Sequence, residues 1–164
     1  MVTEEDLQAV LDELHRLRNR VPQLTGALAA GVDGLVVAHD TPGVDPEGLA
    51  ALTAAALGVA VRVADATRNG GFRELLVRGE RGYVATYAAG RTAVLTLLAQ
   101  DRVNVGRLHL EGRRSGARIG ELLDAADAAA RAARTTSGPA PARTRTTRTQ
   151  RTGTTRTTRT ATDS

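Results

Sequence analysis

The chain has 164 residues, about the length of one domain, and it contains no cysteine, which excludes disulfides, thiolate metal sites and cysteine nucleophiles. Aromatic residues make up only 2% of the chain, so a module that reads RNA by base stacking is not expected. Residues 135–164 hold six arginines and one acid, a charge of +5, and the rest of the chain carries −1. The net charge of +4 therefore belongs to the C-terminal segment, and we expect no specific nucleic-acid partner.

Residues 3–21 are expected to form an amphipathic helix. Thr3 and Asp6 have the spacing of a capping box, and Pro22 ends the pattern. Apolar residues recur at spacings of three and four: Leu7, Val10, Leu11, Leu14, Leu17 and Val21. The first residues are acidic, unlike a signal peptide, which favours a cytoplasmic protein.

Two short strands are predicted next, at Gly26–Ala30 and Leu35–His39. Between them Asp33 and Gly34 form a pair that tolerates the positive φ angles of a tight turn. The two strands should therefore form a hairpin.

The region from Pro46 to about Asp65 predicts a helix, because Asp45 can cap it and Pro46 suits its first position. One apolar face holds Leu49, Leu52, Ala56, Val59, Ala60 and Val63, and a second holds Ala50, Ala54, Leu57 and Val61. A helix that lies on one sheet needs only one such face, so we expect a second protein to cover the other. Complete burial inside the monomer is the alternative. The apolar stretch Leu49–Val63 is shorter than the roughly 20 residues that a membrane-spanning helix needs, so no membrane span is expected.

Three more strands are predicted, at Phe72–Arg78, Tyr83–Ala88 and Thr92–Ala99. Charged residues alternate through the first strand, as at a sheet edge, whereas the last is almost continuously apolar, as in a central strand. Gly79–Gly82 and Gly90–Arg91 suit hairpin turns, so the three strands should be antiparallel neighbours.

A final helix is predicted from about Val103 to Arg134. Its apolar stripe is interrupted by four glycines, which should bend it or allow tight packing: Gly106, Gly112, Gly116 and Gly120. Residues 135–164 are rich in threonine and arginine and should form a disordered tail. This tail is either a solvated extension or an arm that attracts phosphate or kinases.

No catalytic constellation is visible in the sequence. His15, His39 and His109 lie far apart, and no serine sits in a Gly-x-Ser-x-Gly motif. The chain has no lysine, so it lacks a phosphate-binding loop of the Gly-x-x-x-x-Gly-Lys form. We expect a protein that is not an enzyme and binds no cofactor or metal.

Two stretches carry a resemblance to a known family. Residues 21–38 read VPQLTGALAAGVDGLVVA, with the Asp33-Gly34 turn, and residues 104–108 read NVGRL before Glu111, Arg113, Arg114 and Ile119. Together with the order of helix, two strands, helix, three strands and helix, they resemble the roadblock (dynein light-chain roadblock) family. The resemblance covers about residues 3–133.

This resemblance implies an α+β fold, in which a five-stranded antiparallel sheet carries the middle helix on one face and the terminal helices on the other. It also implies a homodimer in which the middle helices pair and the third strands join. Bacterial members are partners of Ras-like small GTPases, some stimulating GTP hydrolysis, and other members are scaffolds or light chains. The family supplies no catalytic residue.

We therefore expect a roadblock-like domain at 1–134, a tail at 135–164, and a homodimeric regulator of a bacterial Ras-like small GTPase. A scaffold dimer and a small-molecule sensor are the alternatives. Arg62 or Arg68 is a conceivable arginine finger. The candidate dimer or partner contacts are Leu49, Leu52, Ala55, Ala56, Gly58, Val59, Arg62, Val63, Phe72, Glu74 and Leu76.

Overall fold

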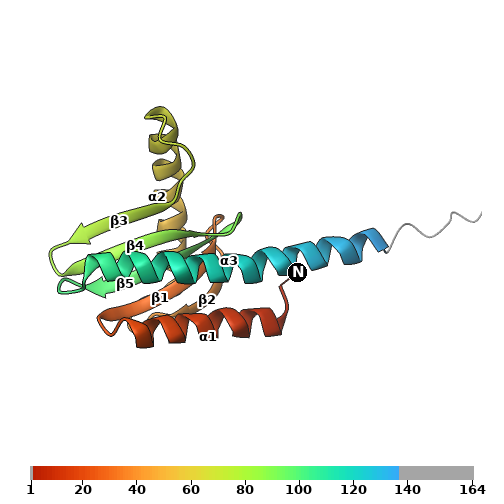
Figure 1. The fold of residues 1–164 in the computed structure, drawn as a ribbon, viewed down its shortest axis with the longest axis horizontal. Coiled ribbons are helices and arrows are strands. Elements are labelled where there is room, and N and C mark those ends of the chain that lie inside the picture. Colours follow the sequence, from red (N-terminus) through yellow and green to blue (C-terminus); the bar gives the residue numbers. More distant parts are fainter. Residues whose placement is uncertain (1, 137–164) are drawn as a thin grey trace, which may run out of the picture.

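The computed structural model describes residues 2–136, which form three helices and five strands (Figure 1). In chain order the elements are α1 (Glu4–Arg20), β1 (Leu24–Gly31), β2 (Val36–Asp40), α2 (Pro46–Ala66), β3 (Glu74–Gly79), β4 (Gly82–Ala89), β5 (Ala93–Gln100) and α3 (Val105–Thr136). The predicted element order is confirmed. Helix α3 includes residues 135 and 136, and the rest of the predicted tail, residues 137–164, lies outside the described residues.

The five strands form one antiparallel sheet in the order β2-β1-β5-β4-β3. Strand β5 is central and β3 is at the edge, as their apolar and charged patterns predict. Helices α1 and α3 lie side by side on one face, and α2 lies on the other and extends past the β3 edge (Figure 1). This arrangement confirms the fold that the resemblance implies.

The two faces of the sheet are covered unequally. The main core lies between the sheet and the α1–α3 pair, and includes Leu14, Leu17, Leu95, Leu108 and Ile119, each with no exposed surface. The core beneath α2 is small: Leu28, Ala30 and Ala50 are buried, with Val36 and Leu49 packed against them. Helix α2 is therefore held to the sheet by a minor contact.

Local sequence signals account for the ends of the helices. Asp6 Oδ2 accepts a hydrogen bond from the Thr3 backbone N–H at 2.8 Å, and Thr3 Oγ1 accepts one from the Asp6 N–H at 3.2 Å, which completes the predicted capping box. Asp45 caps α2 by accepting from the Gly48 N–H at 2.9 Å. In the β1–β2 turn Gly34 has a φ of +85°, as the Asp-Gly pair predicts.

The glycines of α3 let its backbone approach β4 and the turn that follows it. A Cβ atom on Gly112 would collide with the Tyr87 ring, and one on Gly116 would lie 2.9 Å from the Ala88 carbonyl oxygen. A Cβ on Gly120 would lie 2.7 Å from Gly90 Cα, closer than real Cβ atoms approach backbone. Of the two predicted outcomes, bending or tight packing, the structure therefore shows tight packing.

Helix α2 corrects one sequence argument. It has 21 residues and an 18-residue window of mean hydropathy 1.6, so by length and composition it is long and apolar enough to cross a membrane. The length of Leu49–Val63 underestimated this apolar helix, which continues beyond that stretch at both ends. Only 17% of that window is buried inside the chain, and the other positions of the helix are half-buried or exposed.

A buried polar cluster joins α1 to α3. The Glu13 carboxylate, 6% exposed, accepts hydrogen bonds from Ser115 Oγ at 2.7 Å, Arg20 Nη2 at 3.1 Å and Arg16 Nε at 3.2 Å. Arg20 Nε also donates to Glu111 at 2.8 Å. Burial disfavours the charged form of Glu13, but these hydrogen bonds outweigh it and hold its pKa below the usual value of 4.5.

Replacing Glu13 with glutamine is expected to lower the free energy of unfolding at neutral pH by about 2 kcal/mol, because charge-assisted hydrogen bonds are lost. The folded pKa of Glu13 lies below its unfolded value, so its stabilisation is complete above 4.5 and disappears as the pH falls through the folded pKa. Urea unfolding at neutral and acidic pH measures this. The free energy of unfolding should fall less between neutral and acidic pH in Glu13→Gln than in the native protein. The exposed Glu121→Gln is the matched control; an acid dependence unchanged in Glu13→Gln would contradict this account.

Candidate protein-interaction surface

One side of α2 is apolar and exposed. Leu52, Val59 and Val63 are 71%, 64% and 56% exposed, while Ala50 and Leu57 on the opposite side are buried. Of the two apolar faces in the sequence, the one with Ala50 and Leu57 packs within the chain. We call Leu52, Ala55, Val59 and Val63 the outer stripe of α2.

The other candidates on α2 occupy different positions. Ala55, Gly58 and Arg62 are exposed, and Ala56 is half-buried. A Cβ atom on Gly58 would meet nothing within 4 Å, so the space beside it is open. Leu49 packs against the small core beneath the helix and belongs to its inner side.

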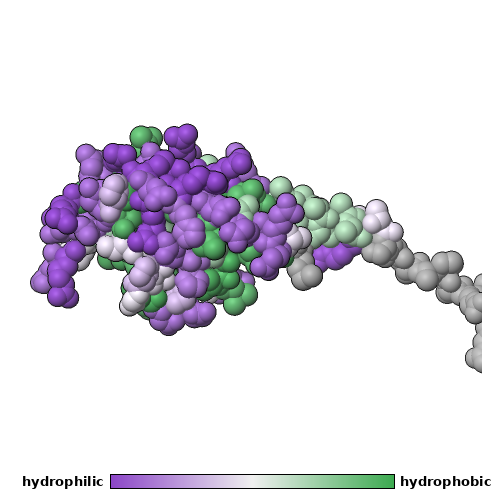
Figure 2. All heavy atoms as spheres, turned by 90° about the horizontal axis from the view of Figure 1, so that it is seen from below, coloured by the Kyte–Doolittle hydropathy of each residue, from purple (hydrophilic) through white to green (hydrophobic). Residues whose placement is uncertain are grey.

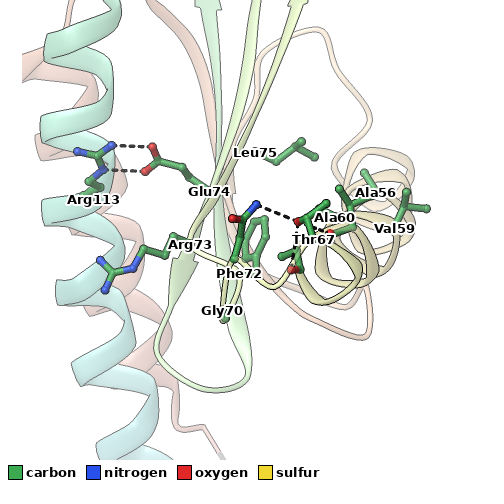
Figure 3. A pocket seen from close by; sticks show the side chains of 14 residues that line it. Ala56, Val59, Ala60, Thr67, Gly70, Phe72, Arg73, Glu74, Leu75 and Arg113 are labelled. Atoms are coloured by element: carbon green, nitrogen blue, oxygen red, sulfur yellow. Dashed lines mark hydrogen bonds and ion pairs between the residues drawn. The ribbon is translucent and has the colours of Figure 1, made fainter.

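A groove of about 1250 Å³ separates the C-terminal half of α2 from the start of β3 (Figure 3). Val59 and Val63 line one wall, and Phe72 and Leu75 line the other. In Figure 3 the Leu75 side chain points toward α2, whereas Glu74 points away from it toward Arg113 on α3. The groove is therefore mainly apolar and continuous with the outer stripe.

The register of β3 shows which of its side chains face this groove. Leu75 and Val77 pair with Thr86 and Val84, on the α2 side of the sheet, and Val77 is 51% exposed. Glu74 and Leu76 point to the opposite face, and Leu76 does not line the groove. Of the three candidates predicted in and before this strand, Phe72 and Glu74 line the groove and Leu76 does not, whereas Leu75 lines it and was not predicted. The two-residue alternation of side chains along a strand is the signal that could have identified Leu75.

Helix α3 holds the edge strand in position. Arg113 donates to both carboxylate oxygens of Glu74, at 2.7 and 2.6 Å, which lowers the pKa of Glu74 and raises that of Arg113. His109 Nδ1 lies 3.0 Å from the Tyr87 hydroxyl and 3.8 Å from Glu74 Oε1. Burial raises the pKa of Tyr87. The outer edge of β3, in contrast, pairs with no other strand within residues 2–136.

Titratable side chains of the described residues form no metal site. Within residues 2–136, no three His, Cys, Asp or Glu side chains are grouped so that they could hold a metal ion. The candidate arginine fingers, Arg62 and Arg68, are both exposed, and neither side chain forms an ion pair with an acid of the described residues. What the surface offers is apolar area beside an open strand edge, which suits protein contact.

Comparison with known proteins identifies the family. The model of the Roadblock/LC7 domain matches residues 10–99. The chain belongs to the Roadblock/LC7 family. An uncharacterized protein of Methanocaldococcus jannaschii is 30% identical over 114 residues, which cover 69% of this chain and 96% of the relative.

Two solved roadblock structures share this fold. MglB in a tetrameric arrangement has 22% identity and a TM-score of 0.72, covering 77% of this chain and 96% of that one. The gliding protein MglB from Thermus thermophilus has 22% identity and a TM-score of 0.68, covering 74% of this chain and 93% of that one. The resemblance drawn from the Asp33-Gly34 hairpin and the element order is thus confirmed.

Proposed function

We propose that this roadblock protein is a cytoplasmic homodimer that regulates a Ras-like small GTPase and contributes no catalytic group of its own. The observation that carries the proposal is the exposed outer stripe of α2 beside the open edge of β3. The family supplies the class of partner, because the roadblock resemblance implies a Ras-like small GTPase.

The exposed surface suits a second copy of the same chain. A side chain such as Leu52 contributes about 1.5–3 kcal/mol when its surface is removed from water, so three exposed branched residues on one helix favour association. Antiparallel pairing of β3 with β3 of a second copy is compatible with two-fold symmetry, in which the same surface serves both partners. This pairing would bring the two α2 helices together and extend the sheet across the dimer.

The GTPase would contact the surface around the paired α2 helices. GTP hydrolysis depends chiefly on positioning and electrostatic stabilisation, so a dimer that holds the switch segments of the GTPase in a competent arrangement is sufficient for regulation.

The proposal is tested by pull-down of candidate small GTPases from the same genome, loaded with GDP or a GTP analogue. We expect the complex to form preferentially in one nucleotide state, because the γ-phosphate orders the switch segments that the dimer would contact. Equal affinity for the GDP-loaded and GTP-analogue-loaded GTPase would contradict regulation and favour a scaffold role. The chain itself is expected to bind no GTP, since it has no lysine for a phosphate loop.

A further inference from the structure

A second surface lies on the face of the domain opposite α2. A groove of about 470 Å³ runs between α1 and α3 and is lined by Glu13, Arg16, Arg20, Arg114, Arg118 and Glu121. Seen from the α1 side, this part of the domain is covered mostly by hydrophilic side chains (Figure 2). The groove thus differs in chemistry from the apolar surface of α2.

The floor of this groove is a fixed polar network. Glu13 is held by Arg16, Arg20 and Ser115, and Arg20 is also held by Glu111. The Arg107 guanidinium donates to the Arg20 carbonyl oxygen at 2.7 Å. The charges of the floor are therefore satisfied within the chain.

The rim of the groove, in contrast, carries arginine side chains whose donors are wholly or partly unpaired within the chain: Arg16, Arg114 and Arg118. The Arg114 guanidinium has no hydrogen bond or ion pair with residues 2–136, and the Arg118 guanidinium has only a 3.5 Å contact with the exposed Glu121. Arg16 donates through Nε alone, so both of its Nη groups are free of partners in this part of the chain. Arg114 and Arg118 lie one turn apart on α3, where like charges repel, so this pair does not serve the helix itself.

We propose that the α1–α3 groove binds an acidic peptide segment of a partner protein. Three guanidinium groups with free donors, Arg16, Arg114 and Arg118, match carboxylates in charge and in the geometry of paired hydrogen bonds. A single-stranded nucleic acid fits less well, because no aromatic side chain lines the groove for base stacking.

This site is independent of the proposed dimer. It lies on the other face of the sheet from α2, so an acidic segment and a partner bound at α2 do not compete for the same surface. The dimer would then carry two such grooves and link its α2 partner to a second protein.

The test is fluorescence anisotropy with a labelled hexaglutamate peptide and the full-length protein. The double variant Arg114→Gln/Arg118→Gln is expected to weaken binding about tenfold, because two charge-assisted contacts are lost. The matched control is Arg81→Gln/Arg131→Gln, which removes the same charge from exposed positions outside the groove, so attraction to arginines elsewhere is equal in both variants. Light scattering confirms that all variants keep the mass of the native protein.

Three outcomes would overturn the proposal. Equal weakening in both double variants would show unspecific attraction to charge. Equally tight binding of a neutral hexaglutamine peptide would show that carboxylates are not recognised. Tighter binding of a short DNA duplex, lost in Arg114→Gln/Arg118→Gln alone, would make the groove a nucleic-acid site.

Discussion

Replacing Gly120 with alanine is expected to lower the free energy of unfolding by about 2–3 kcal/mol, as overpacking of a tight core does. The new Cβ would meet the backbone of Gly90, with Gly90 Cα at 2.7 Å, and backbone atoms cannot rotate away as a side chain can. Helix α3 would have to move off β4, which loosens the contact of Gly116 with Ala88 as well. Urea denaturation followed by circular dichroism measures the loss.

The control for this substitution is Gly106→Ala, in the exposed first turn of the same helix. There a Cβ would lie 3.3 Å from the Asn104 side chain and contact no backbone, so a change of less than about 1 kcal/mol is expected from helix propensity. If Gly120→Ala were as stable as Gly106→Ala, the close approach of α3 to β4 would not exist in solution.

Much of the fold follows from local patterns in the sequence. The Thr3–Asp6 box, the Asp45-Pro46 start and the Gly34 turn act over four residues or fewer, so their physical effect can be judged without tertiary structure. The almost continuous apolar run at Thr92–Ala99 also indicated the central place of β5 in the sheet, because a nearly continuous apolar run suits a strand covered on both faces.

The candidate surface was less predictable because it depends on which side of an element is covered. The periodicity of α2 predicts two apolar faces but does not show which of them packs on the sheet. The structure shows that the face with Ala50 does so, because Ala50 packs with Leu28 and Ala30. In β3 the residues that face the groove follow from the pairing of Leu75 with Thr86, a partner 11 positions away. A shift of one residue in this register would reverse every side chain of the strand.

Contacts between distant segments could not be predicted from the sequence. Glu13 and Ser115 are 102 positions apart, and Glu74 and Arg113 are 39 apart, so no local spacing links them. Arg113 was noted only as part of the family resemblance, yet it fixes the start of the edge strand. The glycines of α3 predicted either bending or tight packing. The residues against which they pack, Tyr87, Ala88 and Gly90, are known only from the structure.

Replacing Val59 with aspartate is expected to convert the proposed dimer into single chains, raising the dissociation constant at least about 100-fold, or about 2.7 kcal/mol. Val59 is 64% exposed in the single chain, so the substitution does not disturb the core. In a two-fold dimer each substitution occurs twice, and each places a charge within apolar contact. Light scattering should give a mass of two chains of 17.2 kDa for the native protein and of one chain for Val59→Asp.

Leu110→Asp is the matched control, because Leu110 is 65% exposed but lies on α3, on the other face of the sheet. This variant should keep the mass of two chains. If both variants dissociate, loss of exposed apolar area anywhere is sufficient and α2 is not the specific contact. If the native protein already has the mass of one chain, the homodimer is wrong, and the outer stripe of α2 must instead be covered by a different partner. The nucleotide-dependent pull-down would still be informative in that case, because a single roadblock chain with an exposed apolar helix offers the GTPase the same side chains without the two-fold axis.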